Sequence, residues 1–403
     1  MNLVPLIIVS ILSSSVSNSE DTATSPKHPK PLMNQSSQLI GYTEMRTDLP
    51  GGRHANVRTM RAAVVKVSGK GKRYLSLKLV DGPDAWTQFA SWSPDGGTAI
   101  VARGWESPVN AQWEEEHKTF RFDKEGWKLD SFLVDLKTSK ETNVTDVDRV
   151  SFYNGGLFFW PNDPTKLGFT ALIDGNSHPF RMDRDGRNKT DLTKESKEFA
   201  YGFSSSRDGK RIAYHKNYQV FLADADGSNA RQVQTGSPFN FGPAWSPDGQ
   251  WVLFLSGEHH NCHPFIVRSD GTGLRKLADR GGYSGSIEFL DVPDFHEGSS
   301  DVPVWSIDGK SVFYTAQSGT CVELFRISLD GTAEQLTHSK SGTLHYHPQQ
   351  SPDGIWLLYG SKRDGVRQIF IMRLSDRFER RLTNLKRGFA AMWPQWQPVN
   401  TSQ

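Results

Sequence analysis

Short runs of alternating apolar and polar residues recur along the chain from about residue 40 to its C-terminal end. Tight-turn residues bound each run, and many of these turns contain Asp-Gly or Pro-Asp-Gly. An alternation with a period of two predicts half-buried β-strands, and Asp-Gly suits the backbone conformation of tight hairpins. The pattern therefore predicts an all-β protein built from many short antiparallel strands.

One turn recurs with nearly constant surroundings. Its copies are WSPDG at Trp92, SSRDG at Ser205, WSPDG at Trp245, WSIDG at Trp305 and QSPDG at Gln350, with a degenerate WPNDP at Trp160. An apolar run follows each copy, then a second run that ends in Asp-Gly or its remnant, then a short third run. Each unit thus holds four strands, and a four-stranded unit that recurs about every 40 residues is typical of a β-propeller.

Six units are visible, and the two ends of the chain supply the strands of a seventh. The C-terminal MWPQWQP looks like the first strand of a unit, while LIGYTEMRT and RAAVVKVSG near the start look like its remaining strands. Pairing these segments closes the ring and removes the open sheet edges of a partial ring. We therefore expect one seven-bladed β-propeller of four-stranded blades over residues 39–399, with the last blade closed by N- and C-terminal strands.

The repeat resembles that of the TolB-like β-propeller family, whose repeats carry the same SPDG turn. The resemblance covers roughly residues 40–398 and implies the propeller fold. It leaves the function open, because propellers of this kind occur in periplasmic binding proteins, in accessory domains of peptidases and in polysaccharide lyases. The function has to be argued from the residues of a site.

The N-terminal residues predict export. MNLVPLIIVSIL is apolar and uncharged, and small polar residues suited to cleavage follow it, so residues 1–19 are predicted to be a signal peptide. Residues 20–38 are rich in Ser, Thr, Pro and Lys and are predicted to form a flexible leader. The mature chain is expected to be periplasmic or secreted, with no membrane span.

Charge and cysteine content narrow the choice of partners. The formal net charge is +2, from 47 basic and 45 acidic residues, which gives no electrostatic support for a nucleic-acid partner. Cys262 and Cys321 each precede a strand of similar pattern. In an oxidising compartment a disulfide between them is one expectation, and two half-buried thiols are the other.

The histidines are the main candidates for chemistry. In a propeller the Asp-Gly hairpins lie on one face of the ring, and the connections from strand two to three and from blade to blade lie on the other, which we call the long-loop face. Histidines in SGEHHNCHPF, VPDFHEG and TLHYHPQQ come from three successive blades, so they are expected to converge in one sector of that face.

Imidazoles that converge with oxygen ligands can bind a divalent transition metal such as Mn, Zn or Fe. The predicted ligands are His263, His345 and His347, with His296, Asp294 and Gln349 as candidates for the rest of the shell. The alternative for each histidine is a hydrogen-bonded structural residue.

The segment HPQQSPDG, which begins at His347, is similar to a segment of the oligogalacturonate lyases in which a metal-binding histidine precedes a corresponding turn. Those enzymes are also seven-bladed propellers. The resemblance implies that His347 binds a metal, that the metal neutralises a uronate carboxylate, and that a histidine acts as the base of a β-elimination. It covers about ten residues and carries over for His347 alone.

Elimination beside a carboxylate needs a cation or arginine to neutralise the carboxylate, and a base within reach of the proton. The candidate catalytic residues on the long-loop face are His215, His178, Lys216, Arg103 and Arg363. The candidate substrate contacts are Tyr214, Trp105, Trp113 and Tyr346. SPVNAQWEEEHK in the first long loop predicts a short helix that starts after Ser107, with Pro108 in its first position.

Two functions from different classes remain. The first is an exported, metal-assisted lyase that acts on an acidic polysaccharide. The second is a non-catalytic TolB-like propeller that binds a cell-envelope protein or glycan as a scaffold.

Overall fold

The computed structural model describes residues 37–117, 126–146, 157–173, 176–194, 198, 200–258, 261–283 and 301–398. The predicted signal peptide and nearly all of the predicted leader lie outside the described residues, as do Asp294 and His296. No helix in the described part of the chain has the length and apolar character required to cross a membrane.

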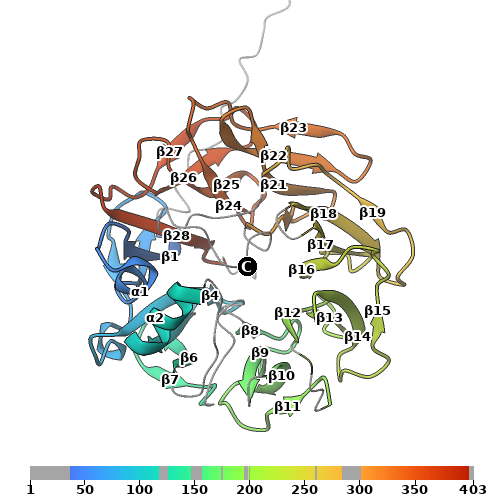
Figure 1. Ribbon diagram of the computed structural model, residues 1–403, viewed down its shortest axis with the longest axis horizontal. Helices are drawn as coiled ribbons and strands as arrows, with labels where there is room; N and C mark the ends of the chain where they lie inside the picture. The colour runs from blue at the N-terminus through green and yellow to red at the C-terminus, as the bar shows by residue number, and fades with distance from the viewer. Residues whose placement is uncertain are drawn as a thin grey trace, which may run out of the picture. The chain divides into compact units, whose positions relative to one another are not determined.

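Seven antiparallel sheets of four strands form a ring (Figure 1), which confirms the predicted seven-bladed propeller. From the inner to the outer strand, blade A contains β28 (Phe389–Trp396), β1 (Leu39–Arg46), β2 (Arg61–Lys66) and β3 (Arg73–Tyr74). Blade B contains β4 (Ala85–Trp92), β5 (Thr98–Glu106), β6 (Trp127–Asp135) and β7 (Glu141–Asn143). Blade C contains β8 (Phe158–Phe159), β9 (Lys166–Ile173), β10 (Asn176–Asp183) and β11 (Thr190–Asp191).

The remaining four blades follow the order of the chain. Blade D contains β12 (Ala200–Ser205), β13 (Arg211–Lys216), β14 (Gln219–Asp224) and β15 (Arg231–Gln232). Blade E contains β16 (Phe239–Trp245), β17 (Trp251–Glu258), β18 (Asn261–Arg268) and β19 (Arg275–Lys276). Blade F contains β20 (Val304–Trp305), β21 (Ser311–Ser318), β22 (Cys321–Ser328) and β23 (Ala333–Gln335). Blade G contains β24 (His345–Gln350), β25 (Trp356–Ser361), β26 (Gln368–Arg373) and β27 (Glu379–Arg381).

Blade A closes the ring as the two chain ends predict. β28 pairs antiparallel with β1, with Ile40 opposite Trp396 and Arg46 opposite Phe389. Helix α1 (Gly52–Val57) follows β1, and helix α2 (Pro108–His117) follows β5. The helix predicted after Ser107 is confirmed, and the Ser107 hydroxyl accepts a hydrogen bond from the backbone N–H of Asn110 at 3.0 Å.

The recurring turn is held together by its serine and aspartate. In blade F, the hydroxyl of Ser306 donates to Asp308 Oδ1 at 2.6 Å and accepts from the backbone N–H of Ser311 at 3.0 Å. Asp308 Oδ1 also accepts from the backbone N–H of Lys310. Blades B, D, E and G repeat the serine-to-aspartate hydrogen bond. These contacts satisfy backbone groups inside the turn, which explains why Ser-x-Asp-Gly marks five of the six copies.

The same hydrogen bonds predict how acid affects stability. The Ser306 hydroxyl, followed by the backbone N–H of Lys310, lowers the pKa of Asp308 in the folded state, so the stabilisation is complete above the unfolded pKa of about 3.9 and is lost as pH falls below it. Replacing Ser306 with alanine should therefore lower the urea midpoint at neutral pH, and the difference from the wild type should shrink near pH 3. An equal difference at both pH values would contradict this account.

Four inner strands share a bulge at which one residue has a left-handed backbone. The register shifts in β12, β16, β24 and β28, and the left-handed residues there are Gly202 (φ 65°), Gly242 (φ 57°), His347 (φ 52°) and Trp393 (φ 50°). Glycine adopts this conformation without a steric penalty, whereas a bulky side chain is strained there. His347 therefore occupies a position where blades D and E carry glycine.

Cys262 and Cys321 are buried free thiols, so the expected disulfide is absent. Cys262 Sγ lies 3.3 Å from the carbonyl oxygen of Glu258, and Cys321 Sγ lies 3.1 Å from that of Lys340. Burial raises the pKa of Cys262 to about 12, which keeps this thiol protonated and unreactive.

Candidate functional site

A chain of hydrogen bonds connects blades E, F and G. Arg280, which lies between β19 and β20, donates its backbone N–H to His263 Nδ1 at 3.2 Å. Its side chain donates from Nε to the carbonyl oxygen of Thr315 at 2.9 Å and from Nη2 to Thr315 Oγ1 at 3.0 Å. Thr315 Oγ1 in turn donates to Asp301 Oδ2, and Asp301 Oδ1 accepts the backbone N–H of His347 at 2.7 Å. We call these five residues the E–G network.

The network contains two predicted residues and two ionisable residues that the sequence did not suggest. His263 and His347 come from the histidine segments that were expected to converge, while Arg280 and Asp301 were missed. Arg280 is 1% exposed and Asp301 is 4% exposed, so both charges are withdrawn from water. Neither residue lies in a repeated motif, although both lie in the connection between blades E and F, which is one of the two oversized loops.

Burial favours neutral imidazoles in this sector. It lowers the pKa of His347, and the nearby Asp301 carboxylate opposes the shift. It also lowers the pKa of His263, with a further lowering from Lys276. Both rings are therefore neutral at pH 7, which is the state that can coordinate a metal ion.

His345 lies next to the network on β24 and is completely buried. Its Nε2 lies 2.8 Å from Ser339 Oγ and 3.4 Å from Glu323 Oε2. Burial raises the pKa of Glu323, but hydrogen bonds from His345, Thr337 and Ser339 outweigh burial and lower the pKa to about 2. The serine and the carboxylate share one ring nitrogen, so these groups do not form a nucleophilic triad, which requires them on opposite nitrogens.

The metal-ligating capacity of β24 depends on two ring nitrogens. His345 Nδ1 and His347 Nε2 are buried and have no hydrogen-bond partner among the described residues. No group of three or more His, Cys, Asp or Glu side chains within the described ranges could hold a metal ion. Gln349 also lies on β24, and its backbone carbonyl accepts from Trp396 Nε1 at 3.2 Å. The donor set therefore fits a metal in part, with two nitrogens and no third ligand in the described chain.

The predicted bases lie in blades C and D. His215 on β13 is 1% exposed, and its Nδ1 accepts the backbone N–H of Gly242 on β16 at 3.3 Å. His178 on β10 lies 2.8 Å from Thr193 Oγ1 and 3.2 Å from Asp191 Oδ2, next to the outer strand β11. His215 therefore reaches the inner strand of the neighbouring blade, whereas His178 is held toward the rim.

The other polar residues that were predicted to be catalytic already form ion pairs with acidic residues. Lys216 Nζ lies 2.6 Å from Glu198 Oε2, and Arg103 Nη2 lies 2.5 Å from Asp81 Oδ1. Arg363 Nη1 lies 2.6 Å from Glu379 Oε2, and its Nη2 donates to the Tyr359 hydroxyl at 2.9 Å. The structure places Arg103 in blade B and Arg363 in blade G. It therefore does not bring together the two arginines that were predicted to bind the carboxylate of the substrate.

The four predicted substrate contacts differ in exposure. Tyr346 is completely buried, and its hydroxyl donates to the carbonyl oxygen of Ala391 at 2.8 Å. Tyr214 is 3% exposed, and burial raises its pKa to about 12. Trp105 on β5 and Trp113 on α2 are half-buried, and Trp113 stacks on the ring of His117 with centroids 4.0 Å apart. The two tryptophans are thus the accessible members of this set.

Sequence comparison agrees with the repeat and the ring. Residues 215–401 match the family described as the TolB beta propeller domain. The seven closed blades make the chain a seven-bladed propeller, and its C-terminal part is similar to the TolB beta propeller domain.

Known relatives of this TolB-like propeller are distant. An uncharacterized peptidase of Bacillus subtilis, YuxL, is 24% identical over 162 residues, which is 40% of this chain and 23% of the relative. The aligned regions span less than half the length of the curated relatives that the chain matches.

Two solved structures show the same fold at low identity. TolB from Acinetobacter baumannii has a TM-score of 0.50 at 15% identity, over 90% of this chain and 67% of that one. An oligogalacturonate lyase in complex with manganese has a TM-score of 0.54 at 13% identity, over 87% of this chain and 86% of that one. Identities this low establish the architecture alone.

A buried ionic cluster in the TolB-like propeller also escaped sequence analysis. Arg53 Nη2 on α1 lies 2.7 Å from Glu106 Oε1 and 2.8 Å from Glu114 Oε2 on α2. His54 lies between Glu106 and Asp84, at 3.3 and 3.2 Å. Glu114 belongs to an acidic run of the sequence, yet it is completely buried. The cluster joins blades A and B through their helices.

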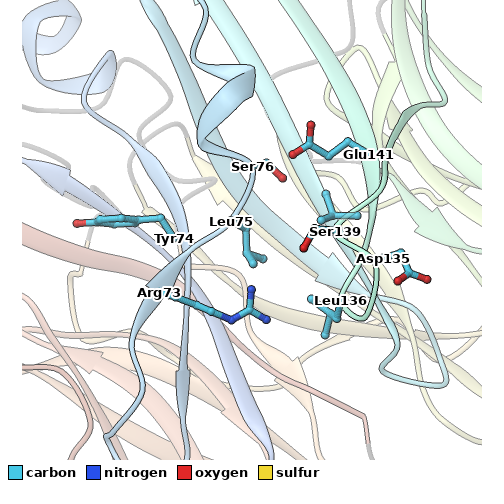
Figure 2. Close-up of a pocket in the computed structure, with 9 residues that line it drawn as sticks. Arg73, Tyr74, Leu75, Ser76, Asp135, Leu136, Ser139 and Glu141 are labelled. Atoms are coloured by element: carbon cyan, nitrogen blue, oxygen red, sulfur yellow. The ribbon is translucent and has the colours of Figure 1, made fainter.

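A small cavity lies at the outer edge of blades A and B (Figure 2), where β3 faces the β6–β7 hairpin. Its volume is about 80 Å³, and Arg73, Tyr74, Asp135 and Glu141 are among its lining residues. Ligand pockets usually measure about 300–1,000 Å³, so this cavity is too small for a sugar ring and its substituents. It contains none of the predicted site residues.

Proposed function

We propose that this TolB-like propeller is an exported lyase that binds an acidic polysaccharide on the long-loop face and cleaves it by metal-assisted β-elimination. The observation that supports this function best is a pair of buried nitrogens, His345 Nδ1 and His347 Nε2, that have no hydrogen-bond partner in the described part of the chain. Burial lowers the pKa of both rings. Buried polar atoms without partners are rare in folded proteins and call for an explanation such as an ion.

His345 and His347 would hold a first-row divalent cation such as Mn, Zn or Fe, which requires the bulge in β24 to turn both ring nitrogens toward one side. When bound, the cation would neutralise the uronate carboxylate and so make the adjacent C–H group more acidic. Asp301 holds the backbone of His347 in its left-handed conformation and thereby orients the ring. Asp294 and His296, which lie outside the described residues, remain predicted ligands.

His215 is the base that the geometry favours over His178, because its ring contacts the inner strand of blade E. It would accept the proton from the carbon next to the carboxylate. The C–O bond of the glycosidic linkage then breaks, a carbon–carbon double bond forms, and the departing oxygen takes a proton from solvent. Trp105 on β5 and Trp113 on α2 would stack on sugar rings.

The test is an elimination assay on the purified full chain. With polygalacturonate and added Mn²⁺, ultraviolet absorbance of the unsaturated product should rise. It should stay flat with a neutral galactan, and chelator should abolish it until metal is restored. Absence of product with every polyuronide and metal supplied would remove the catalytic proposal.

A second function is a non-catalytic binding propeller for a cell-envelope protein or glycan. The observation that favours it is that Arg103 and Arg363 already form ion pairs with carboxylates of this chain, although both were predicted to bind the carboxylate of a substrate. This function predicts calorimetric binding of an envelope glycan or protein without any unsaturated product, and without a requirement for metal.

A further inference from the structure

Arg280 is a buried cation that forms no ion pair with any residue in the described part of the chain. Its side chain is withdrawn from water, with a relative exposure of 1%. Two other partly buried arginines, Arg53 and Arg363, are neutralised, because Arg53 binds Glu106 and Glu114 and Arg363 binds Glu379. No carboxylate of the described residues lies within ion-pair distance of Arg280, and its Nη1 has no hydrogen-bond partner among them.

The guanidinium is fixed by its neighbours on every other side. Nε and Nη2 donate to the carbonyl oxygen and the hydroxyl of Thr315, and the guanidinium carbon lies 4.3 Å from the centre of the Tyr283 ring. The Thr315 hydroxyl donates its only proton to Asp301. Asp301 is therefore linked to Arg280 through Thr315 Oγ1 and makes no direct hydrogen bond to the guanidinium. The side chain is held rigid, and its buried Nη1 group has no hydrogen-bond partner among the described residues.

A buried charge without a counter-charge is strongly unfavourable, and the penalty disappears when an anion binds. Arginine suits a carboxylate because its N–H groups match the two oxygens. The hydrogen bonds through Thr315 and Asp301 also place Arg280 in the same sector as His347. A carboxylate bound to Arg280 would therefore lie in the sector where the cation is proposed to act.

We infer that Arg280 Nη1 is the binding site for a ligand carboxylate, and that this site selects uronates over neutral sugars. The inference rests on the proposed function for the identity of the ligand as a polyuronide. The binding site at Arg280 itself requires only a carboxylate. Arg280 thus takes the role that sequence analysis gave to Arg103 and Arg363, whose guanidinium groups are occupied.

The test is calorimetric titration of wild type and Arg280→Lys with a galacturonate trimer, a neutral galactose trimer and malonate. Lysine keeps the charge but loses the forked donor, so uronate affinity should fall by about 10- to 100-fold. Arg275→Lys is the matched control, because Arg275 precedes Arg280 by five residues and its Nη2 contacts a backbone carbonyl, that of Leu329. That variant should bind as the wild type does. Circular dichroism and thermal unfolding establish that each variant is folded.

The outcomes separate this inference from the proposed function. Uronate binding that is unchanged in Arg280→Lys overturns the inference and leaves the lyase proposal standing. Malonate binding that depends on Arg280, without uronate binding, supports a carboxylate site at Arg280 and contradicts the polyuronide proposal. No binding of any carboxylate to the wild type overturns both. If Arg280→Lys unfolds, Thr315→Val provides the second test, because it removes the hydroxyl that orients Nη2 and should also weaken carboxylate binding.

Discussion

Replacing His347 with glycine is expected to lower polyuronide elimination on the order of 100-fold or more while the propeller stays folded, because the substitution removes a proposed metal-ligating nitrogen. The backbone should tolerate glycine well. His347 has φ 52° at a bulge where Gly202 and Gly242 hold the equivalent positions in blades D and E. The measurement is the initial rate of unsaturated product at saturating Mn²⁺.

Comparison with His347→Ala separates the function of this residue from its backbone strain. Both variants lose the imidazole, so both should lose activity equally. Alanine keeps the left-handed penalty of about 1–2 kcal/mol, and glycine relieves it while losing about 0.4–1 kcal/mol through the freer unfolded chain. The glycine variant should therefore be the more stable of the two, by about 1 kcal/mol in urea unfolding.

The control for this experiment is His338→Ala. His338 is an exposed histidine in the connection between β23 and β24, and it has no role in the proposed site. Its removal should leave the elimination rate unchanged. Equal rates for wild type and His347→Gly would show that the strained histidine has another role, and would contradict a metal site at this position.

The architecture was predictable because its signals are local. Alternating strands, Ser-x-Asp-Gly turns and the strand-like ends of the chain each act within a few residues, and together they leave ring closure as the only way to pair every edge. The helix after Ser107 was equally local, since its first turn carries its own cap.

The chemistry was less predictable because it depends on tertiary pairing. Arg363 finds Glu379 across two strands, and Arg280 meets Thr315 across a blade boundary. No spacing in the sequence reports such contacts. A regular strand would also put His345 and His347 on the same face. The bulge in β24 breaks this alternation, since the register shifts between Tyr346 and Gln349.

Tyr346 is a core residue on β24, the strand that also carries the candidate metal ligands His345 and His347. Its ring covers Gly360 on β25, where an added Cβ would lie 2.0 Å from a ring atom. An aromatic ring over a glycine of the neighbouring strand recurs in blade B, where Trp86 covers Gly104. A tyrosine expected to contact substrate thus fills the space that a missing side chain leaves in the core.

Replacing Tyr346 with alanine should lower the free energy of unfolding by about 3–5 kcal/mol, since a fully buried aromatic ring leaves a cavity that Gly360 has no side chain to fill. Tyr346→Phe should cost only about 0.5–1.5 kcal/mol, because it keeps the ring and removes the hydrogen bond to Ala391 on the closing strand β28. Phe378→Ala is the control, because that ring is 52% exposed and its loss should change stability little. Urea unfolding followed by tryptophan fluorescence ranks the three variants. A loss for Tyr346→Ala no larger than that for Phe378→Ala would mean that the ring does not pack as this structure has it, and that the inner strand of blade G is free to present Tyr346 to a ligand.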